Sequence, residues 1–168
     1  LVAWNRRDGS YQKYTTLDGV PYHTIETLLA DQDGNLWAGT EMAGVIRFDG
    51  QDWAAFDEDN GLPSDSVYAL FQARDGTLIA GTRYTSDAIS VFDGGDWSTP
   101  DWVVPDLPPA PVEFPKPVVF LEDEEGQLII GLTDEGGLLY TDGTEWYHFT
   151  TTDGLPSDTI NSLAFDTE

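Results

Sequence analysis

Apolar and polar residues alternate in short runs that recur along the chain in groups of four. In the first complete group, the runs cover residues 24–30, 35–40, 44–48 and 52–56. Alternation over runs of this length is typical of half-buried β-strands. Asp-Gly steps lie between the runs and permit the positive backbone angles of tight hairpin turns. The pattern therefore predicts antiparallel units of four short strands.

The four-strand unit is repeated. The letters DGLPSD at 153–158 nearly duplicate NGLPSD at 60–65, and a weaker copy, DGVP, lies at 18–21. Self-similarity at a fixed period indicates a repeat architecture, and four strands per unit is typical of a propeller blade. Further strands are expected at 66–72, 77–82, 89–92, 96–98, 118–122, 127–131, 137–140 and 145–149.

We therefore expect an all-β fold, a β-propeller of four-stranded antiparallel blades that forms an arc of a larger propeller. Three complete blades are flanked by two partial terminal blades. The expected divisions are 1–16 (two outer strands), 17–57, 58–100, 101–150 (with a Pro-rich loop insertion) and 151–168 (one inner strand, Thr159 to Phe165).

Composition narrows the classes of function. A hydrophobic content of 40% excludes a disordered chain, and the absence of cysteine excludes disulfides and thiol chemistry. The formal charge of -24 repels phosphate backbones and anionic lipids. No apolar run approaches the roughly 20 residues of a membrane span. We expect no nucleic-acid partner and no membrane contact by this segment.

The first complete unit has a recognisable signature. It reads TLDGVP at 16–21, LADQDGNLWAGT at 29–40 and GVIRFDG at 44–50. This combination resembles the two-component regulator propeller repeat family. The resemblance implies a role like that of the extracytoplasmic sensor propellers of hybrid two-component systems, which lie above a transmembrane helix and a histidine kinase. It thus implies signal transduction and a periplasmic or extracellular location.

Two faces of the propeller follow from the strand directions. The Gly-Leu-Pro linkers and the loops after the second strands share one face, here called the linker face. The Asp-Gly turns share the opposite face, here called the turn face. Loops of variable sequence on a rigid scaffold tend to carry binding residues. The variable loops, 41–43, 83–88, 101–117 and 133–136, all fall on the linker face.

The linker face holds a mixture of aromatic residues and scarce cations that suits a glycan or another small molecule, stacked on a ring and held by charge-assisted hydrogen bonds. The candidate ligand-binding residues are Arg83, Tyr84, Trp102, Phe114 and Lys116. The alternative interpretation is that Trp102 and Phe114 only pin the long loop to its blade.

Other aromatic and acidic residues have structural interpretations. Trp53, Trp97 and Trp146 recur at one fourth-strand position, which favours packing between blades. The acidic run 122–125 favours turn solvation, with a weak divalent-ion site as the alternative. We expect no catalytic residue, no metal and no cofactor.

Three classes of function stay open. The leading hypothesis is a noncatalytic sensor segment that binds a small molecule or glycan. The second is a structural or adhesion propeller whose partners are further blades or another protein chain. The third is a lyase-like enzyme with His23 as general acid or base.

Overall fold

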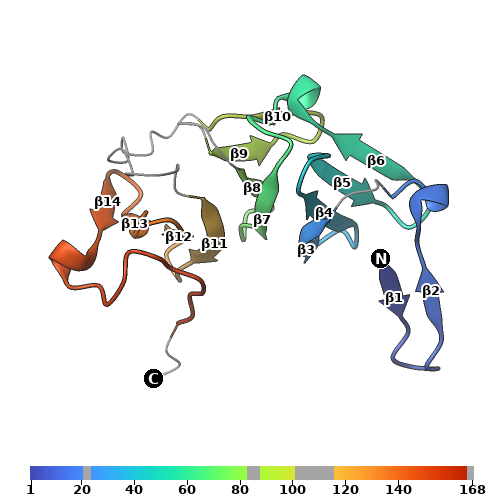
Figure 1. Cartoon of the computed structure of the whole chain (residues 1–168), viewed down its shortest axis with the longest axis horizontal. Coiled ribbons are helices and arrows are strands. Elements are labelled where there is room, and N and C mark those ends of the chain that lie inside the picture. The colour runs from blue at the N-terminus through green and yellow to red at the C-terminus, as the bar shows by residue number, and fades with distance from the viewer. Residues whose placement is uncertain (21–23, 83–87, 101–115, 166–168) are drawn as a thin grey trace.

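The computed structural model describes residues 1–20, 24–82, 88–100 and 116–165 of the chain. Figure 1 shows three β-sheets side by side in an open arc, preceded by a separate hairpin. The hairpin consists of β1 (Val2–Trp4) and β2 (Tyr11–Lys13). The all-β fold of four-stranded antiparallel blades is confirmed.

Each sheet contains four strands in chain order. Blade 1 contains β3 (Ile25–Ala30), β4 (Leu36–Thr40), β5 (Val45–Phe48) and β6 (Trp53–Phe56). Blade 2 contains β7 (Val67–Gln72), β8 (Leu78–Thr82), β9 (Ile89–Phe92) and β10 (Trp97–Ser98). Blade 3 contains β11 (Pro117–Glu122), β12 (Leu128–Leu132), β13 (Leu138–Thr141) and β14 (Trp146–Phe149). The inner strands β3, β7 and β11 lie toward the open side of the arc (Figure 1).

The last expected strand, Thr159 to Phe165, does not form, and that prediction is wrong. Residues 159–165 have no neighbouring strand in the described part of the chain, and a strand needs a hydrogen-bonding neighbour along its length. The Ile160 amide still donates to the Leu132 carbonyl at 2.8 Å. Ile160 also packs on Gly131, as Val67 packs on Gly39. The segment therefore lies at an inner-strand position without a ladder.

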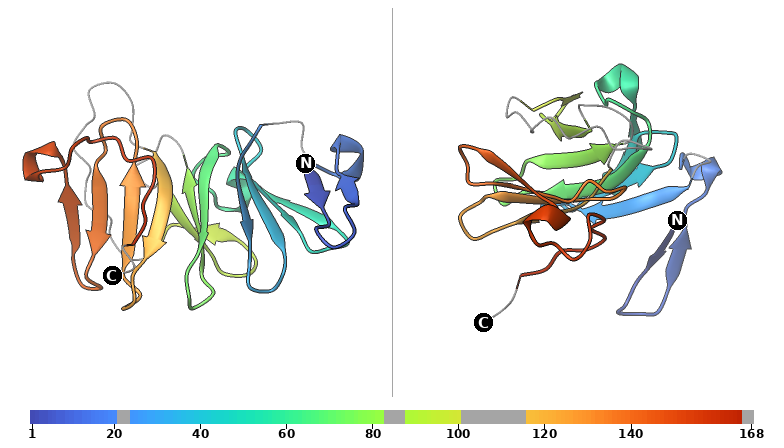
Figure 2. Two further views of the ribbon diagram at one scale, coloured as in Figure 1. Left: turned by 90° about the horizontal axis from the view of Figure 1, so that it is seen from below. Right: turned by 60° about the vertical axis from the view of Figure 1, so that its left-hand side comes forward.

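Three short 3-10 helices, which the sequence analysis did not predict, precede blade 1, join blade 1 to blade 2 and follow blade 3. They are η1 (Thr16–Asp18), η2 (Glu58–Asn60) and η3 (Thr151–Asp153). Each begins with a capping box and ends at a glycine in the left-handed region. In the left view of Figure 2, η1 and η3 lie at the upper edge and the tight turns lie at the lower edge.

The hydrophobic core is divided among the spaces between blades. One cluster joins Trp37, Val45 and Phe56 of blade 1 to blade 2 residues that include Trp97. A second cluster joins blade 2 to blade 3, with Trp146 packed against it. A third joins Val20 and Tyr14 to blade 1, where Trp53 lies. The three fourth-strand tryptophans thus pack against these clusters between blades, in agreement with the structural interpretation.

Gly61 permits a close contact between the linker that precedes blade 2 and the last strand of that blade. A Cβ atom added at Gly61 would lie 1.9 Å from the carbonyl oxygen of Trp97, at the end of the same blade. Gly61 also has a φ of +88°. Gly34, in the turn after β3, has the same φ of +88° but nothing within 4 Å of an added Cβ. A substitution at Gly34 therefore meets backbone strain alone, whereas one at Gly61 meets backbone strain and crowding.

Replacement of these glycines by alanine tests the crowding directly. Gly34→Ala is expected to lower the free energy of unfolding by about 1 kcal/mol, because of the left-handed backbone alone. Gly61→Ala is expected to lower it by about 1–3 kcal/mol more, because the methyl group also overlaps a carbonyl oxygen. Urea denaturation measures both values, and equal losses would contradict the close approach.

The turn after β3 is organised by a carboxylate. Asp31 accepts hydrogen bonds from the Asn35 side chain and from the Trp37 indole, each at 2.7 Å. Burial acts to raise the pKa of Asp31, but these hydrogen bonds, with those from the turn amides, hold it below its usual value. The ionised carboxylate therefore stabilises the folded state.

This carboxylate predicts a pH dependence. A lowered folded-state pKa gives stability that is present above the unfolded pKa of about 3.9 and is lost as the pH falls through the folded value. Asp31→Asn is therefore expected to lose less stability than the wild type between about pH 5 and pH 2. Thermal unfolding of both proteins across this pH range measures the loss of stability. Asp33→Asn is the control, because it removes the same charge from the same turn. If Asp33→Asn reduced the loss of stability in acid as much as Asp31→Asn does, the assignment to Asp31 would be refuted.

Candidate functional site

Four of the five candidate ligand-binding residues, Arg83, Tyr84, Trp102 and Phe114, lie outside the described residues. His23 also lies outside them. Lys116 is described, and it precedes β11 on the linker face. Lys116 and its neighbours are therefore the described part of the candidate site.

Lys116 lies between blade 2 and blade 3. Its ammonium nitrogen is 3.5 Å from a carboxylate oxygen of Asp134 and 5.5 Å from the centre of the Tyr68 ring. Its carbonyl oxygen accepts a hydrogen bond from the Thr133 amide at 3.0 Å. The Lys116 side chain is largely buried, whereas that of Asp134 is more exposed. Lys116 is thus held by a cation–π contact and an ion pair at the base of the 133–136 loop.

The 133–136 loop has an uncommon backbone. Asp134 and Glu135 have φ values of 54° and 66°, the two positive values outside glycine among the described residues. The left-handed region is costly for residues with a Cβ, and such residues cluster at binding sites. The loop is held by the Gly136 amide, which donates to the Thr133 carbonyl, and by a 2.6 Å contact between the Gly136 carbonyl and His148. His148 therefore has a structural role in this loop.

The sequence analysis identified 133–136 as a variable loop but did not single out Asp134 or Glu135. The available signal was weak, because consecutive acidic residues also occur in ordinary turns. Together, Lys116, Asp134 and Glu135 place an ammonium group and two carboxylates at one edge of the linker face. Such a mixture can donate and accept hydrogen bonds with the hydroxyl groups of a polar ligand.

The acidic run at 122–125 lies on the turn face and accepts hydrogen bonds there. Glu122 accepts a hydrogen bond from the Arg74 amide at 2.8 Å, and the Glu124 carbonyl accepts one from the Arg74 guanidinium at 3.0 Å. Asp123 accepts two hydrogen bonds from amides of its own turn. The run therefore closes a turn and connects blade 2 to blade 3. Among the described residues, no three acidic or histidine side chains gather as metal ligands.

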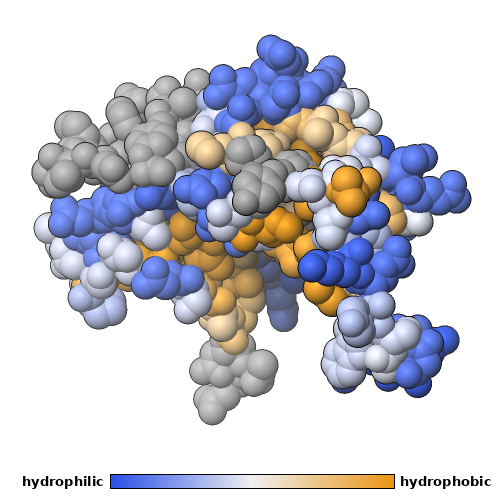
Figure 3. All heavy atoms as spheres, turned by 45° about the vertical axis from the view of Figure 1, so that its right-hand side comes forward, coloured by the Kyte–Doolittle hydropathy of each residue, from blue (hydrophilic) through white to orange (hydrophobic). Residues whose placement is uncertain are grey.

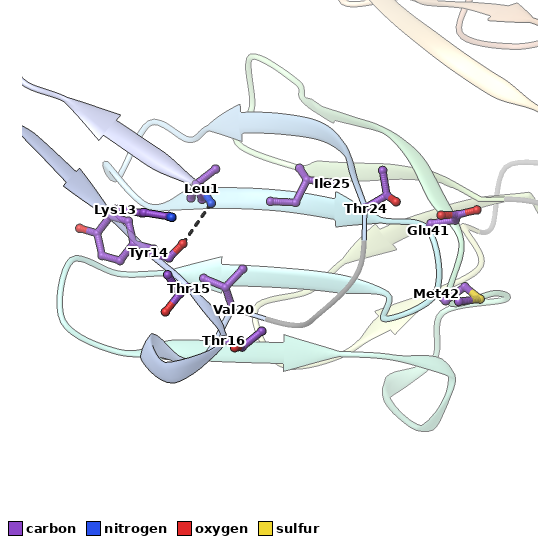
Figure 4. A pocket seen from close by; sticks show the side chains of 10 residues that line it. All are labelled: Leu1, Lys13, Tyr14, Thr15, Thr16, Val20, Thr24, Ile25, Glu41 and Met42. Atoms are coloured by element: carbon purple, nitrogen blue, oxygen red, sulfur yellow. Dashed lines mark hydrogen bonds between the residues drawn. The ribbon is translucent and has the colours of Figure 1, made fainter.

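A hollow of about 660 Å³ lies between the N-terminal hairpin and blade 1 (Figure 4). Its lining comprises Leu1, Lys13, Tyr14, Thr15, Thr16, Val20, Thr24, Ile25, Glu41 and Met42. The hairpin corresponds to the third and fourth strands of a blade, so the hollow lies where the inner strands of that blade would pack. Leu28 of β3 is 51% exposed, whereas Phe120, at the same register in β11, is 7% exposed. The hollow is thus an incomplete interface between blades.

In the view of Figure 3, hydrophobic residues gather in the middle, and hydrophilic residues surround them. Within the described parts of the chain, no helix is long and apolar enough to span a membrane.

Comparisons with known proteins identify the repeat. Residues 19–42 and 61–84 match the family model described as two component regulator propeller. These segments contain the linker and the first two strands of blades 1 and 2. No curated protein matches the chain significantly.

The fold is similar to that of solved extracellular domains from B. thetaiotaomicron. One is that of BT3049, described as a hybrid two component system, with a TM-score of 0.71, 22% identity, 88% of this chain covered and 19% of that chain. Another is that of BT4673, described in one structure as a hybrid two component system, with a TM-score of 0.56, 16% identity, 99% of this chain covered and 28% of that chain. The chain therefore spans 19% and 28% of the length of these two relatives.

The strained loop predicts a stabilising substitution. Glu135→Gly is expected to raise the free energy of unfolding by about 0.5–1 kcal/mol, because glycine adopts a positive φ without steric cost, although it also adds entropy to the unfolded chain. Urea denaturation measures the change. Glu124→Gly, in a turn where the φ of residue 124 is not positive, should destabilise the protein. A loss of stability in Glu135→Gly as large as in this control would contradict the strain.

Proposed function

The chain carries repeats of the two component regulator propeller family, and we propose that it is a noncatalytic part of a sensor propeller that binds a glycan or another small molecule on its linker face. The observation that carries this proposal is the 133–136 loop, where two residues with a Cβ have a positive φ beside Lys116. A strained backbone held by packed neighbours is a feature of binding sites.

The scaffold supports this proposal. Among the described residues, each of the three 3-10 helices is capped by hydrogen bonds, and the loops after the second strands of blades 1 and 3 are tied to the following linker. For example, the Gly44 amide donates to the Asp65 carbonyl at 2.8 Å, and the Gly137 amide donates to the Asp158 carbonyl at 2.6 Å. The linker face therefore presents its loops from a rigid base, which lowers the entropy that a ligand must offset on binding.

We propose a periplasmic or extracellular location for the chain. The similar solved structures are described as extracellular domains. The charge of -24 supports the further proposal that nucleic acid and anionic membrane surfaces are not partners of this segment.

A second function, that of an interaction module, is favoured by a different observation. Large hydrophobic side chains are exposed at both ends of the arc, among them Trp4, Tyr11 and Phe149. Exposed apolar patches mark sites of contact with other protein surfaces, which include further blades of a longer propeller. The third hypothesis, a lyase, depends on His23, and no contact among the described residues supports it. The solved neighbours are described as extracellular domains of hybrid two component systems.

Binding measurements on the 168-residue chain test the sensor proposal. A panel of neutral and acidic oligosaccharides is first screened by thermal shift, and the saccharides that raise the melting temperature are then titrated by calorimetry. Lys116→Met should weaken binding at least about tenfold, because a hydrogen bond to a charged group contributes about 1.5–3 kcal/mol. The double variant Arg83→Ala with Trp102→Ala should weaken it as well.

Lys13→Met is the matched control, since Lys13 lies in β2 and lines the hollow rather than the linker face. Its affinity should equal that of the wild type. Affinity that is unchanged in Lys116→Met and in the double variant would refute the assigned site. If no saccharide raises the melting temperature while a protein partner does, the interaction-module function is favoured instead.

A further inference from the structure

The capping boxes of the three 3-10 helices are built from different pairs of side chains. The pairs are Thr15 with Asp18 in η1, Thr150 with Asp153 in η3, and Asp57 with Asn60 in η2. Each pair contains one carboxylate. In η1 and η3 the carboxylate is the last residue of the helix, whereas in η2 it is the residue before the helix. The two positions have exchanged their charge in the helix that joins blade 1 to blade 2.

The exchange has a chemical reason. In η1, the hydroxyl group of Thr15 donates to the Asp18 carboxylate at 3.0 Å, and η3 has the same contact at the same distance. An ionised Asp57 has no proton to donate, so a second carboxylate at residue 60 would repel it. The side chain of Asn60 is neutral, and its oxygen accepts a hydrogen bond from the Asp57 amide at 3.2 Å. Asparagine therefore completes this box without repulsion.

Asn60 is followed by Gly61, and none of the other asparagines, Asn5, Asn35 and Asn161, precedes a glycine. Glycine has no side chain to hinder the approach of its backbone nitrogen to the side-chain carbonyl carbon of the preceding residue. The side-chain nitrogen of Asn60 makes no hydrogen bond among the described residues, so nothing there retains it as a leaving group. These features favour the loss of that nitrogen as ammonia.

We propose that Asn60 is a site of spontaneous deamidation, and that its conversion to aspartate loosens the linker between blades 1 and 2. The backbone nitrogen of Gly61 attacks the side-chain carbonyl carbon of Asn60, ammonia leaves, and a cyclic succinimide forms. Water then opens the ring at one of its two carbonyl groups, which gives either an aspartate or an isoaspartate. The proposal is independent of any ligand on the linker face.

The folded structure slows this reaction. The Gly61 amide donates to the Glu58 carbonyl at 3.1 Å, and this hydrogen bond closes the last turn of η2. The nitrogen must leave this bond before it can attack Asn60. The reaction in the folded protein therefore requires a local opening of η2, and a denaturant is expected to accelerate it.

The linker that begins at η2 connects the packing of the two blades to the linker face. Leu62 is 3% exposed and belongs to the first cluster between blades. The Asp65 carbonyl accepts the hydrogen bond from the Gly44 amide that ties the 41–43 loop to this linker. A second carboxylate in the box weakens the start of the linker by repulsion. An isoaspartate also lengthens the main chain beside Gly61, where an added Cβ would already lie 1.9 Å from the Trp97 carbonyl oxygen.

Thermal unfolding of variants tests the effect on the linker. Asn60→Asp reproduces the aspartate product and should lower the melting temperature of the 168-residue chain by about 2–4 °C, the shift expected when a chain of this size loses one cap. The double variant Asp57→Thr with Asn60→Asp provides the same pair as η1 and η3. Relative to Asp57→Thr alone, it should lose no stability, because the threonine hydroxyl can donate to the new carboxylate.

Gln12→Glu is the control for net charge. It adds the same charge at an exposed position of β2, away from η2, and should leave the melting temperature unchanged. A loss in this control as large as in Asn60→Asp would mean that overall repulsion, rather than the capping box, causes the effect.

Incubation of the wild type at mildly alkaline pH, with and without guanidinium chloride, tests the reaction itself. Ion-exchange chromatography should reveal an acidic species, and peptide mapping by mass spectrometry should locate the change at Asn60, sooner in the denaturant. Asn35 and Asn161, which precede larger residues, should react later. Asn60→Gln should form no such species in the same time, because its longer side chain closes a less favourable ring. The isolated product should melt at or below the temperature of Asn60→Asp.

Any one of four results would overturn the proposal. They are a wild-type melting temperature in Asn60→Asp, an equal loss in the double variant and in Asn60→Asp, deamidation at Asn35 or Asn161 as fast as at Asn60, and a folded protein that retains Asn60 after the unfolded chain has fully reacted. The first two would remove the effect on the linker, and the last two would remove the site.

Discussion

The packing of aromatic third- and fourth-strand residues against the preceding blade is the interaction on which the rest of the structure depends. The three hydrophobic clusters all lie between adjacent units rather than within one sheet. A single blade therefore has no core of its own, and its stability comes from its neighbours, as in other repeat proteins. Glycines such as Gly39 and Gly81 permit this packing, because an added Cβ would lie within 3 Å of the next inner strand.

This dependence on neighbours explains why apolar side chains are exposed at both ends of the arc. It also separates the packed blades from the loops of the linker face. Where a neighbour is missing, side chains of the interface are exposed, as Leu28, Trp4 and Phe149 show. Among the described residues of the linker face, the loops 41–43 and 133–136 supply no member of the clusters between blades. The strained backbone at Asp134 and Glu135 therefore lies in a loop, outside the packed blades that support it.

Much of the fold could be predicted, because local patterns decide it. Period-two alternation located the twelve strands of the complete blades, with ends that differ by one residue at most. The capped 3-10 helices were missed, although a Thr or Asp three residues before an Asp or Asn was a signal for them. The strand at 159–165 was wrong because pairing is a tertiary property. Of the candidate site, Lys116 could be placed on the correct face, but its contacts with Asp134 and Tyr68 could not be predicted, since they join different blades.

The sequence by itself determined the blade, its repeat and its two faces, since hydrophobic periodicity and turn residues act over a few neighbouring positions. It also determined which tryptophans recur at equivalent positions. Only the tertiary structure decided which surfaces are covered, because burial depends on whether a neighbouring blade is present. It also decided that Asp134 and Glu135 adopt a left-handed backbone. These properties arise from contacts between residues that are far apart in the chain.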